Sequence, residues 1–509
     1  MNQFSRTGAY AIYSRTGMVL LAIVVLLFGF LASKTTAVMA IVVGLFGAMF
    51  FIYQVVKKPS LALTIMFALS FVLIGATRLV PAPFGLVIDV MIYLTWIVLF
   101  FKSFNGADWS LKKTSLTTAM TIWMGYNLFQ LVNPEARSVQ AWIFAVRALA
   151  LYSFLLIPLI FLAYNQKKDF KLFINIWFLA SLLLGLYGAK QQIFGVNGFE
   201  QRWLDAGAGE QHVLWGKLRV FSFLSDAGQF GASQGHAACV AIIFAIKERS
   251  TKLKIFYYAT GFVALYGMAI SGTRGAMFVP IGGFALYLVL SKNFKIMAIG
   301  GFVGGLLGFL LVFTMFMNSN PTIARMRTAF DSDDASMNVR AENRAALANY
   351  LQSRPFGGGV GSAGAWGDRF TPGTFLAEFQ TDGQYTRVYA ETGIVGLYIY
   401  LGVLFFILGK MMWITWNIKD PELYQQMAAL TCGVAGMMLA NYGNAYTGQI
   451  PSSLIFFFSM GFVYLAPKWD KGEEYPIFGD VSHLKAKKIS GAVGDKLIEL
   501  KTVFNKNEL

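Results

Sequence analysis

Charged residues are scarce in this sequence, and so are cysteine and histidine. Asp, Glu, Lys and Arg make up 13% of the 509 residues, whereas hydrophobic residues make up 56%. Soluble domains are about 25% charged and about 45–50% apolar, so the composition excludes an ordinary water-soluble protein and indicates one that folds in lipid. The two cysteines, Cys239 and Cys432, lie in apolar runs, which argues against a disulfide framework. The three histidines do not have the spacing of a zinc site, so we expect no metal and no cofactor.

Long apolar runs are abundant instead. About fourteen of them approach the ~20 helical residues that cross a bilayer. They cover residues 18–33, 36–56, 60–79, 84–101, 115–132, 139–164, 170–194, 227–246, 253–270, 275–290, 294–317, 388–408, 423–441 and 451–466. The runs lack the polar/apolar alternation of membrane β-strands. The sequence therefore predicts an all-α polytopic membrane protein with about 14 transmembrane helices.

Lysines gather in alternate loops. The lysine-rich connections carry Lys57, Lys58, Lys102, Lys112, Lys113, Lys167, Lys168, Lys247, Lys252, Lys292, Lys410 and Lys419. By the positive-inside rule these loops and both termini are cytoplasmic. The predicted division is transmembrane helices 1–11 at 1–317, a large periplasmic loop at 318–387, transmembrane helices 12–14 at 388–466 and a basic cytoplasmic tail at 467–509.

The cations of the opposite face are mostly arginines rather than lysines. They include Arg202, Arg219, Arg274, Arg325, Arg327, Arg340, Arg344, Arg354, Arg369 and Arg387. A guanidinium group is a planar fork that holds phosphate in two places, so this face is expected to bind a phosphate-bearing ligand. The alternative is that these arginines only solubilise the loops.

Asp89, Arg147 and Lys190 are charged residues that lie within apolar runs. Charge inside a membrane is costly unless it is paired or faces a polar cavity. Two interpretations stay open for Arg147: a structural ion pair with Asp89, or a cationic cleft for a lipid phosphate together with Arg274. Lys190 either joins that cleft or extends to the membrane surface.

The large loop contains a predicted amphipathic helix at 336–353. Arg340, Arg344, Leu347 and Leu351 recur at i, i+4, i+7 and i+11, so they share one helix face. Two guanidinium groups beside an apolar stripe suit a helix that lies on the membrane domain and contacts phosphate.

A glycine run, PFGGGVGSAG at 355–364, follows this helix. Gly358, Gly359 and Gly361 allow backbone N–H groups to converge on an anion, although a flexible hinge would use the same residues. The next stretch, TDGQYTRVYAETGIVG, places Asp382 at the membrane surface and Glu391 further along the same span.

Three motifs in order resemble the O-antigen ligase and polymerase superfamily. They are SGTRGAM at 271–277, RPFGGGVGSAG at 354–364 and ETGIVGL at 391–397, and the likeness extends over about 253–408. The resemblance implies a glycosyltransferase-C-like, metal-independent enzyme of the bacterial inner membrane that acts in lipopolysaccharide or exopolysaccharide biosynthesis. Such enzymes take a glycan from undecaprenyl pyrophosphate on the periplasmic face and join it to an acceptor hydroxyl. Ligases use lipid A–core as acceptor, polymerases use another lipid-linked repeat unit, and both remain open here.

The resemblance also implies roles for particular residues. Arg274 matches the family's arginine after the serine-rich turn, and Arg340 or Arg344 its loop arginine. Many ligases carry a histidine shortly before the E-x-G-x-x-G segment, whereas this chain has Asp382 in that region.

The proposed chemistry needs few groups. Arginines stabilise the charge that grows on the departing pyrophosphate, and one carboxylate takes the acceptor proton. We therefore predict Asp382 as general base, with Glu391 as the second candidate, and Arg147, Arg274, Arg340, Arg344 and Lys190 as pyrophosphate ligands. No nucleic acid is expected as a partner. The rival prediction is a transporter or flippase of lipid-linked oligosaccharide, which would also need a cationic cavity.

Overall fold

The computed structural model describes residues 36–104, 108–214, 216–314, 324, 327, 335–476 and 478. The run at 18–33 and most of the tail at 467–509 lie outside these residues, as does the side chain of Arg340. The chain forms two compact units, Met1–Leu61 and Ala62–Leu509, and each is described by itself. In the first unit, α3 (Thr36–Lys57) is an apolar helix that ends at Lys57, whose ammonium group lies 4.3 Å from the centre of the Tyr53 ring.

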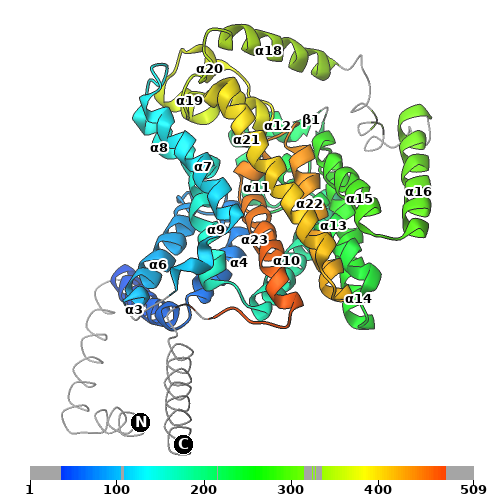
Figure 1. The fold of residues 1–509 in the computed structure, drawn as a ribbon. Coiled ribbons are helices and arrows are strands. Elements are labelled where there is room, and N and C mark those ends of the chain that lie inside the picture. Colours follow the sequence, from blue (N-terminus) through cyan, green and yellow to red (C-terminus); the bar gives the residue numbers. More distant parts are fainter. Residues whose placement is uncertain are drawn as a thin grey trace, which may run out of the picture. The chain divides into compact units, whose positions relative to one another are not determined.

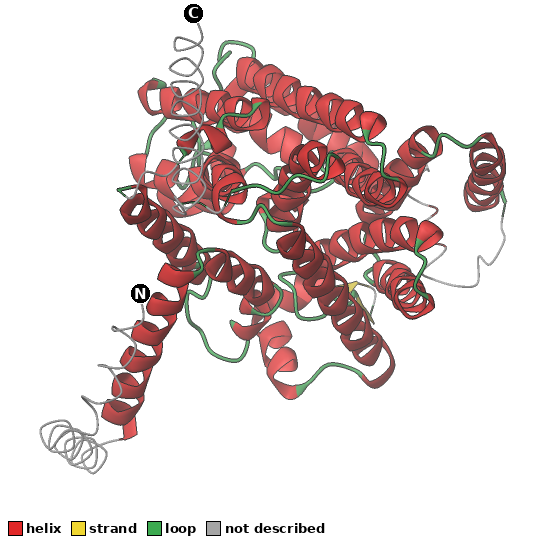
Figure 2. Ribbon diagram, turned by 60° about the horizontal axis from the view of Figure 1, so that its bottom comes forward, coloured by secondary structure: helices red, strands yellow, loops and turns green. Residues whose placement is uncertain are grey.

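From Ser60 onward the described chain is almost entirely helical. Its longer helices are α4 (Ser60–Ser70), α6 (Leu86–Ser103), α7 (Ser115–Phe129), α8 (Val139–Val146), α9 (Tyr152–Ala163), α10 (Lys167–Phe194), α13 (Ala227–Lys247), α14 (Thr251–Ile270), α15 (Phe278–Leu290), α16 (Phe294–Phe313), α18 (Ala335–Leu351), α21 (Gln384–Asn417), α22 (Pro421–Ala440) and α23 (Ser452–Asp470). Short helices are α5 (Leu73–Ala76), α11 (Gly198–Trp203), α12 (Gly209–His212), α19 (Gly364–Phe370) and α20 (Phe375–Glu378). Strands β1 (Val213–Leu214) and β2 (Lys217–Leu218) form one antiparallel pair, drawn in yellow in Figure 2.

Each apolar run within the described residues forms helix, but some helices are interrupted. The run at 60–79 divides into α4 and α5, and the run at 139–164 contains a π-helical turn over Arg147–Leu151. By length and composition, six helical stretches of the described chain can cross a membrane: Leu86–Ser103, Val139–Ala163, Lys167–Phe194, Ala227–Lys247, Thr251–Ile270 and Gln384–Asn417. The structure is consistent with the predicted all-α membrane fold, whereas the predicted number of spans is not confirmed.

The core of the second unit surrounds α13, which contacts α10, α14, α15 and α22. These helices lie side by side in Figure 1. Small residues allow the close approach, because a Cβ atom at Gly283 would lie 2.4 Å from the Cys239 sulfur and one at Gly436 would lie 2.1 Å from the Val279 carbonyl oxygen. In lipid, such small-residue contacts replace the hydrophobic driving force that packs helices in water.

One end of this bundle carries most of the non-helical structure, and we call it the loop end. It is formed by the last residues of α14 and α22 and the first residues of α13 and α21. Helix α18 forms where the spacing predicts an amphipathic helix, and it lies at the top of Figure 1. Its apolar stripe is buried: Leu347 and Leu351 pack with Leu376 in a small cluster that also includes Ala363 and Ala390.

Candidate functional site

The turn SGTRG connects α14 to α15 at the loop end, and its first residues explain its shape. The Ser271 hydroxyl donates to the Met268 carbonyl at 2.7 Å and accepts from the Thr273 N–H at 3.2 Å. Gly272 has φ of +57°, the left-handed conformation that commonly ends a helix. Helix α14 therefore stops at this point, and Arg274 begins a short 3-10 turn at the loop end.

Thr273 ties this turn to a second arginine. Its hydroxyl donates to the Ala227 carbonyl at 3.1 Å and accepts from Arg219 Nη2 at 3.0 Å. Arg219 also donates through Nη1 to the Gln211 carbonyl at 3.1 Å. The turn thus holds Arg219, from the segment before α13, beside its own Arg274.

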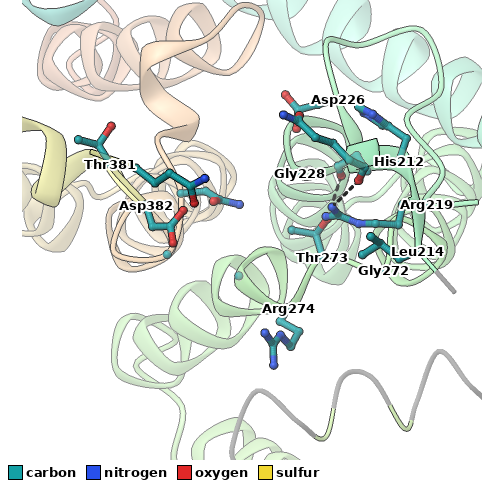
Figure 3. A pocket seen from close by; sticks show the side chains of 16 residues that line it. His212, Leu214, Arg219, Asp226, Gly228, Gly272, Thr273, Arg274, Thr381 and Asp382 are labelled. Carbon is teal, nitrogen blue, oxygen red and sulfur yellow. Dashed lines mark hydrogen bonds between the residues drawn. The ribbon is translucent and has the colours of Figure 1, made fainter. Parts of the chain in front are cut away.

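A cavity of about 630 Å³ opens at this place, and we call it the arginine cavity. It is lined by residues 211, 212, 214, 219, 226–228, 272–275, 380–382, 443 and 444. Figure 3 shows Thr381 and Asp382 on one side of it and His212, Arg219 and Asp226 on the other. In this view the Arg274 side chain extends from the turn away from Arg219. Parts of the chain far apart in sequence therefore build one polar space.

Glycine is required where the turn meets the segment after α22. A Cβ atom at Gly275 would lie 2.9 Å from the Tyr446 hydroxyl oxygen and 4.0 Å from the Gly443 Cα. The Tyr446 hydroxyl accepts from Asn444 Nδ2 at 3.0 Å, so a shift of this hydroxyl would weaken that hydrogen bond. Gly275 thus sets how closely the Arg274 turn approaches Gly443 and Asn444, which line the cavity.

His212 lies in the cavity wall with one defined tautomer. Its Nδ1 is 2.9 Å from the Ala208 carbonyl oxygen, which can only accept, so Nδ1 carries the proton and Nε2 is left as an acceptor. The ring packs against Trp203 and Phe221, with centroid distances of 4.9 Å and 5.3 Å. Burial lowers the pKa of His212, and the nearby Arg219 acts in the same direction, so the imidazole is neutral at pH 7.

Arg78 holds the segment that carries Arg219 and Asp226. It donates to the carbonyl groups of Ser222, at 2.9 Å, and Ser225, at 3.3 Å, and to that of Leu224. Its guanidinium group lies 4.3 Å from the Trp203 ring and 4.4 Å from the Phe221 ring. Burial lowers the pKa of Arg78 to about 10, which still leaves it a cation at neutral pH.

Two of the residues predicted from the sequence, Arg274 and Asp382, line the same cavity. Arg344 lies close by: its Nη1 donates to the Tyr442 hydroxyl, and it lines a smaller crevice that shares Asp382 with the cavity. The side chain of Arg340, on the same helix, is outside the described part of the chain.

Arg147 and Lys190 lie elsewhere. Arg147 forms an ion pair with Asp89, and Tyr152 completes the group by accepting from Arg147 Nη2 at 3.1 Å and donating to Asp89 Oδ1 at 2.8 Å. Lys190 donates to the Gly195 carbonyl at 2.8 Å and to Asn197 Oδ1 at 2.7 Å. Neither residue lines the arginine cavity.

Glu391 and the glycine run contact each other instead of the cavity. Glu391 is fully buried, accepts from Arg387 Nε at 3.1 Å and faces the backbone N–H groups of Gly361 and Ala363. The run itself packs tightly: Gly359 and Gly361 have φ of +91° and +87°, and a Cβ atom at Gly361 would lie 2.5 Å from the Ala141 carbonyl oxygen. Gly358 donates through its N–H to the Ala390 carbonyl at 3.0 Å. The anion near these glycines is therefore a carboxylate of the chain itself.

Sequence reasoning did not single out Arg219 or His212. Arg219 is one of many arginines predicted on the same face. Its contacts with Thr273 and with the Gln211 carbonyl distinguish it in the structure, and no local sequence pattern indicates them. Within the described ranges, no group of three or more His, Cys, Asp or Glu side chains could hold a metal ion.

These features define a helical membrane protein with a polar, arginine-lined cavity at one end of its helix bundle. Residues 259–401 match the family model Wzy_C, described as O-antigen ligase. Over this segment the match confirms the predicted likeness to the O-antigen ligase and polymerase superfamily. It contains Arg274 and Asp382, whereas Arg219 and His212 precede it. A search of curated proteins gave no match to the chain.

Proposed function

We propose that this protein transfers a glycan from undecaprenyl pyrophosphate to an acceptor hydroxyl on the periplasmic side of the bacterial inner membrane. The observation that carries the proposal is the arginine cavity, a polar space of about 630 Å³ whose wall includes Arg219, Arg274 and Asp382. The match of residues 259–401 to the O-antigen ligase family supports the same class of reaction.

The step needs one bond to form and one to break. The acceptor oxygen attacks the anomeric carbon of the donor sugar, the bond from that carbon to the pyrophosphate oxygen breaks, and the electron pair leaves with the pyrophosphate. Asp382 takes the acceptor proton, a contribution of about 10²–10⁴-fold for a well-placed base. Arg219 and Arg274 stabilise the charge on the departing group, and the cavity holds both reactants in line.

Glu391 is the second candidate for the base. Its carboxylate is fully buried and paired with Arg387, so it has less access to an acceptor than Asp382 in the cavity wall. This contrast favours Asp382.

The lysine distribution supports the orientation of the proposal. With the lysine-rich loops and both termini in the cytoplasm, the loop end of the bundle lies at the periplasmic face, where lipid-linked glycans are joined. A ligase and a polymerase differ in the acceptor, so both acceptors belong in the test.

The test uses the purified protein in lipid nanodiscs with undecaprenyl-pyrophosphate oligosaccharide, with and without lipid A–core. A ladder of products without added acceptor identifies a polymerase, and one shifted product with lipid A–core identifies a ligase. Arg274→Ala and Asp382→Asn are expected to abolish product at normal expression, with Arg202→Ala, an exposed arginine outside the cavity, as the matched control. Unchanged substrate with the wild-type protein contradicts the proposal and favours a flippase.

A further inference from the structure

His212 offers the arginine cavity a hydrogen-bond acceptor and no donor. Its Nδ1–H donates to the Ala208 carbonyl, so the lone pair of the neutral ring is on Nε2, and no residue of the described chain donates to that atom. The side chain is only 4% exposed and lines the cavity. A buried acceptor that is left without a partner is costly, so Nε2 needs a donor from outside the chain.

The direction of this acceptor is fixed by the packing of the ring. Trp203 and Phe221 lie against His212 with centroid distances of 4.9 Å and 5.3 Å. The Arg78 guanidinium group lies 4.3 Å and 4.4 Å from the centres of the same two aromatic rings. His212 is therefore oriented before any ligand arrives.

His212 and Arg219 lie opposite each other at the base of the short hairpin formed by β1 and β2. The register pairs Val213 with Leu218, which makes His212 and Arg219 the next pair, and the Arg219 N–H donates to the His212 carbonyl at 2.7 Å. Both side chains line the cavity, and Figure 3 shows them on the same side of it. Nη1 and Nη2 of Arg219 each donate one of their two N–H groups to the chain, which leaves one N–H on each for a ligand.

This pair fits a ligand that combines an anion with a hydrogen-bond donor. Arg219 suits an anion, whereas Nε2 of His212 accepts only from an O–H or N–H group. A pyrophosphate diester is fully ionised at neutral pH and has no proton to donate, so it cannot serve both residues. A sugar attached to the pyrophosphate supplies the hydroxyl or acetamido N–H groups. The volume of about 630 Å³ lies within the range of about 300–1,000 Å³ that is typical of small-ligand sites.

The acceptor substrate also carries hydroxyl groups, but its reacting hydroxyl is assigned to Asp382. Figure 3 shows Asp382 across the cavity from His212 and Arg219. The sugar that arrives with the pyrophosphate is therefore the partner that the position of His212 favours.

We propose that Nε2 of His212 accepts a hydrogen bond from a hydroxyl or amide N–H group of the donor's first sugar, the one attached to the pyrophosphate. The proposal rests on the proposed transferase function and adds a residue that recognises the donor sugar. It also distinguishes substrate from product, because the undecaprenyl pyrophosphate that remains after transfer has no group to donate to Nε2.

Two substitutions of nearly the same shape separate the two ring nitrogens. In His212→Asn the amide nitrogen takes about the place of Nδ1, so the contact with Ala208 is kept and the acceptor at Nε2 is lost. In His212→Gln the amide reaches about the place of Nε2 and can still accept. Gln201→Ala, an exposed glutamine outside the cavity, is the control.

The measurement is the affinity of the purified protein in lipid nanodiscs for two probes, undecaprenyl-pyrophosphate oligosaccharide and undecaprenyl pyrophosphate. His212→Asn is expected to weaken binding of the oligosaccharide probe by about fivefold, the effect of one lost hydrogen bond. Its affinity for undecaprenyl pyrophosphate stays within about twofold of wild type on the same scale, and His212→Gln recovers part of the loss. Arg219→Ala weakens binding of both probes.

Two results with His212→Asn overturn the proposal. Equal weakening of both probes would mean that His212 only supports Arg219, and unchanged affinity for the oligosaccharide probe would mean that water satisfies Nε2. If neither variant folds, the wild-type protein still provides a test: it is expected to bind the oligosaccharide probe at least about fivefold more tightly than undecaprenyl pyrophosphate, and equal affinities overturn the contact.

The binding experiment contains no acceptor, so its result is independent of turnover. A protein that makes no product but shows the selective loss in His212→Asn would contradict the transferase function and keep the sugar contact. A protein that makes product but shows no such loss would keep the function and exclude His212 from donor recognition.

Discussion

At the scale of single residues, the arginine cavity depends on side chains that are held by their neighbours rather than left in solvent. Arg219 is fixed by Thr273 and the Gln211 carbonyl, and His212 by the Ala208 carbonyl. Burial lowers the pKa of Arg219, while Asp226 acts to raise it. A cation that is partly desolvated in this way interacts more strongly with an arriving anion than one in bulk water does.

Replacing Arg219 tests this directly. We expect Arg219→Ala to lower kcat by about 10²–10³-fold, the usual effect of removing one group that stabilises transition-state charge. Turnover of the proposed undecaprenyl-pyrophosphate donor by purified variants measures the effect, with Arg202→Ala as control. A rate within about threefold of wild type, small on the scale of such losses, would remove Arg219 from the donor site.

The buried imidazole makes a prediction about pH. The pKa of His212 is lowered in the folded protein, so between its folded and unfolded pKa values the unfolded chain binds more protons and stability falls as pH falls. One such proton changes the stability by at most about 1.4 kcal/mol per pH unit. The thermal unfolding midpoint should therefore drop from pH 7 to pH 5 more steeply in wild type than in His212→Gln. Parallel curves for the two proteins would show that His212 titrates alike in both states.

At the scale of elements, the loop end is assembled by close contacts between short segments. The turn after α14 meets the segment after α22 through Gly275 and Gly443, and Arg78 fastens the segment before α13. None of these contacts depends on helix propensity. They depend on which backbone atoms come within reach once the helices have packed.

The contact at Gly275 can be tested with a compensating change. Gly275→Ala places a methyl group 2.9 Å from the Tyr446 hydroxyl oxygen, so we expect it to shift the Arg274 turn and lower transferase activity by about tenfold or more. Adding Tyr446→Phe removes that oxygen and should restore part of the rate. Gly125→Ala, where a Cβ atom meets nothing within 4 Å, serves as control. A double variant no better than Gly275→Ala would mean that the steric explanation is wrong.

Arg78 donates hydrogen bonds to carbonyl groups within the segment at 219–226, and we predict that it positions this segment. Arg78→Lys keeps the charge but replaces the planar fork, whose Nη1 and Nη2 donate to different carbonyl groups, with a single nitrogen. We expect faster hydrogen–deuterium exchange over residues 219–226 and a lower kcat with little change in the donor KM. Exchange equal to wild type in this segment would contradict a positioning role.

At the scale of the whole molecule, hydropathy located the helices but not the site. A transmembrane helix can be predicted from the sequence because every residue of an apolar run adds to the same local hydropathy. Each apolar run within the described chain forms helix. The sequence predicts the Asp89–Arg147 pair as one of two interpretations, but not the π-helical turn that begins at Arg147 or the contact of Asp89 with Tyr152. The same limit applies to Arg219, whose partner Thr273 lies on another element.

The orientation of the molecule is a separate prediction. With the loop end at the periplasm, Asn349→Cys should react with a membrane-impermeant maleimide in intact cells, and Ser250→Cys only after permeabilisation, because Ser250 lies in a lysine-rich connection. Both positions are exposed, and the native Cys239 and Cys432 are buried, which keeps the background low. The reverse labelling pattern would place the arginine cavity in the cytoplasm.

The walls of the arginine cavity come from both sides of the segment that matches the O-antigen ligase family. Arg219 and His212 lie before that segment, and Asn444 lies after it. Excising residues 259–401, or grafting them into a related scaffold, would thus carry Arg274 and Asp382 along without the partners that complete their surroundings. Chimeras should be joined outside 211–444, so that donor chemistry and its supporting contacts are inherited together.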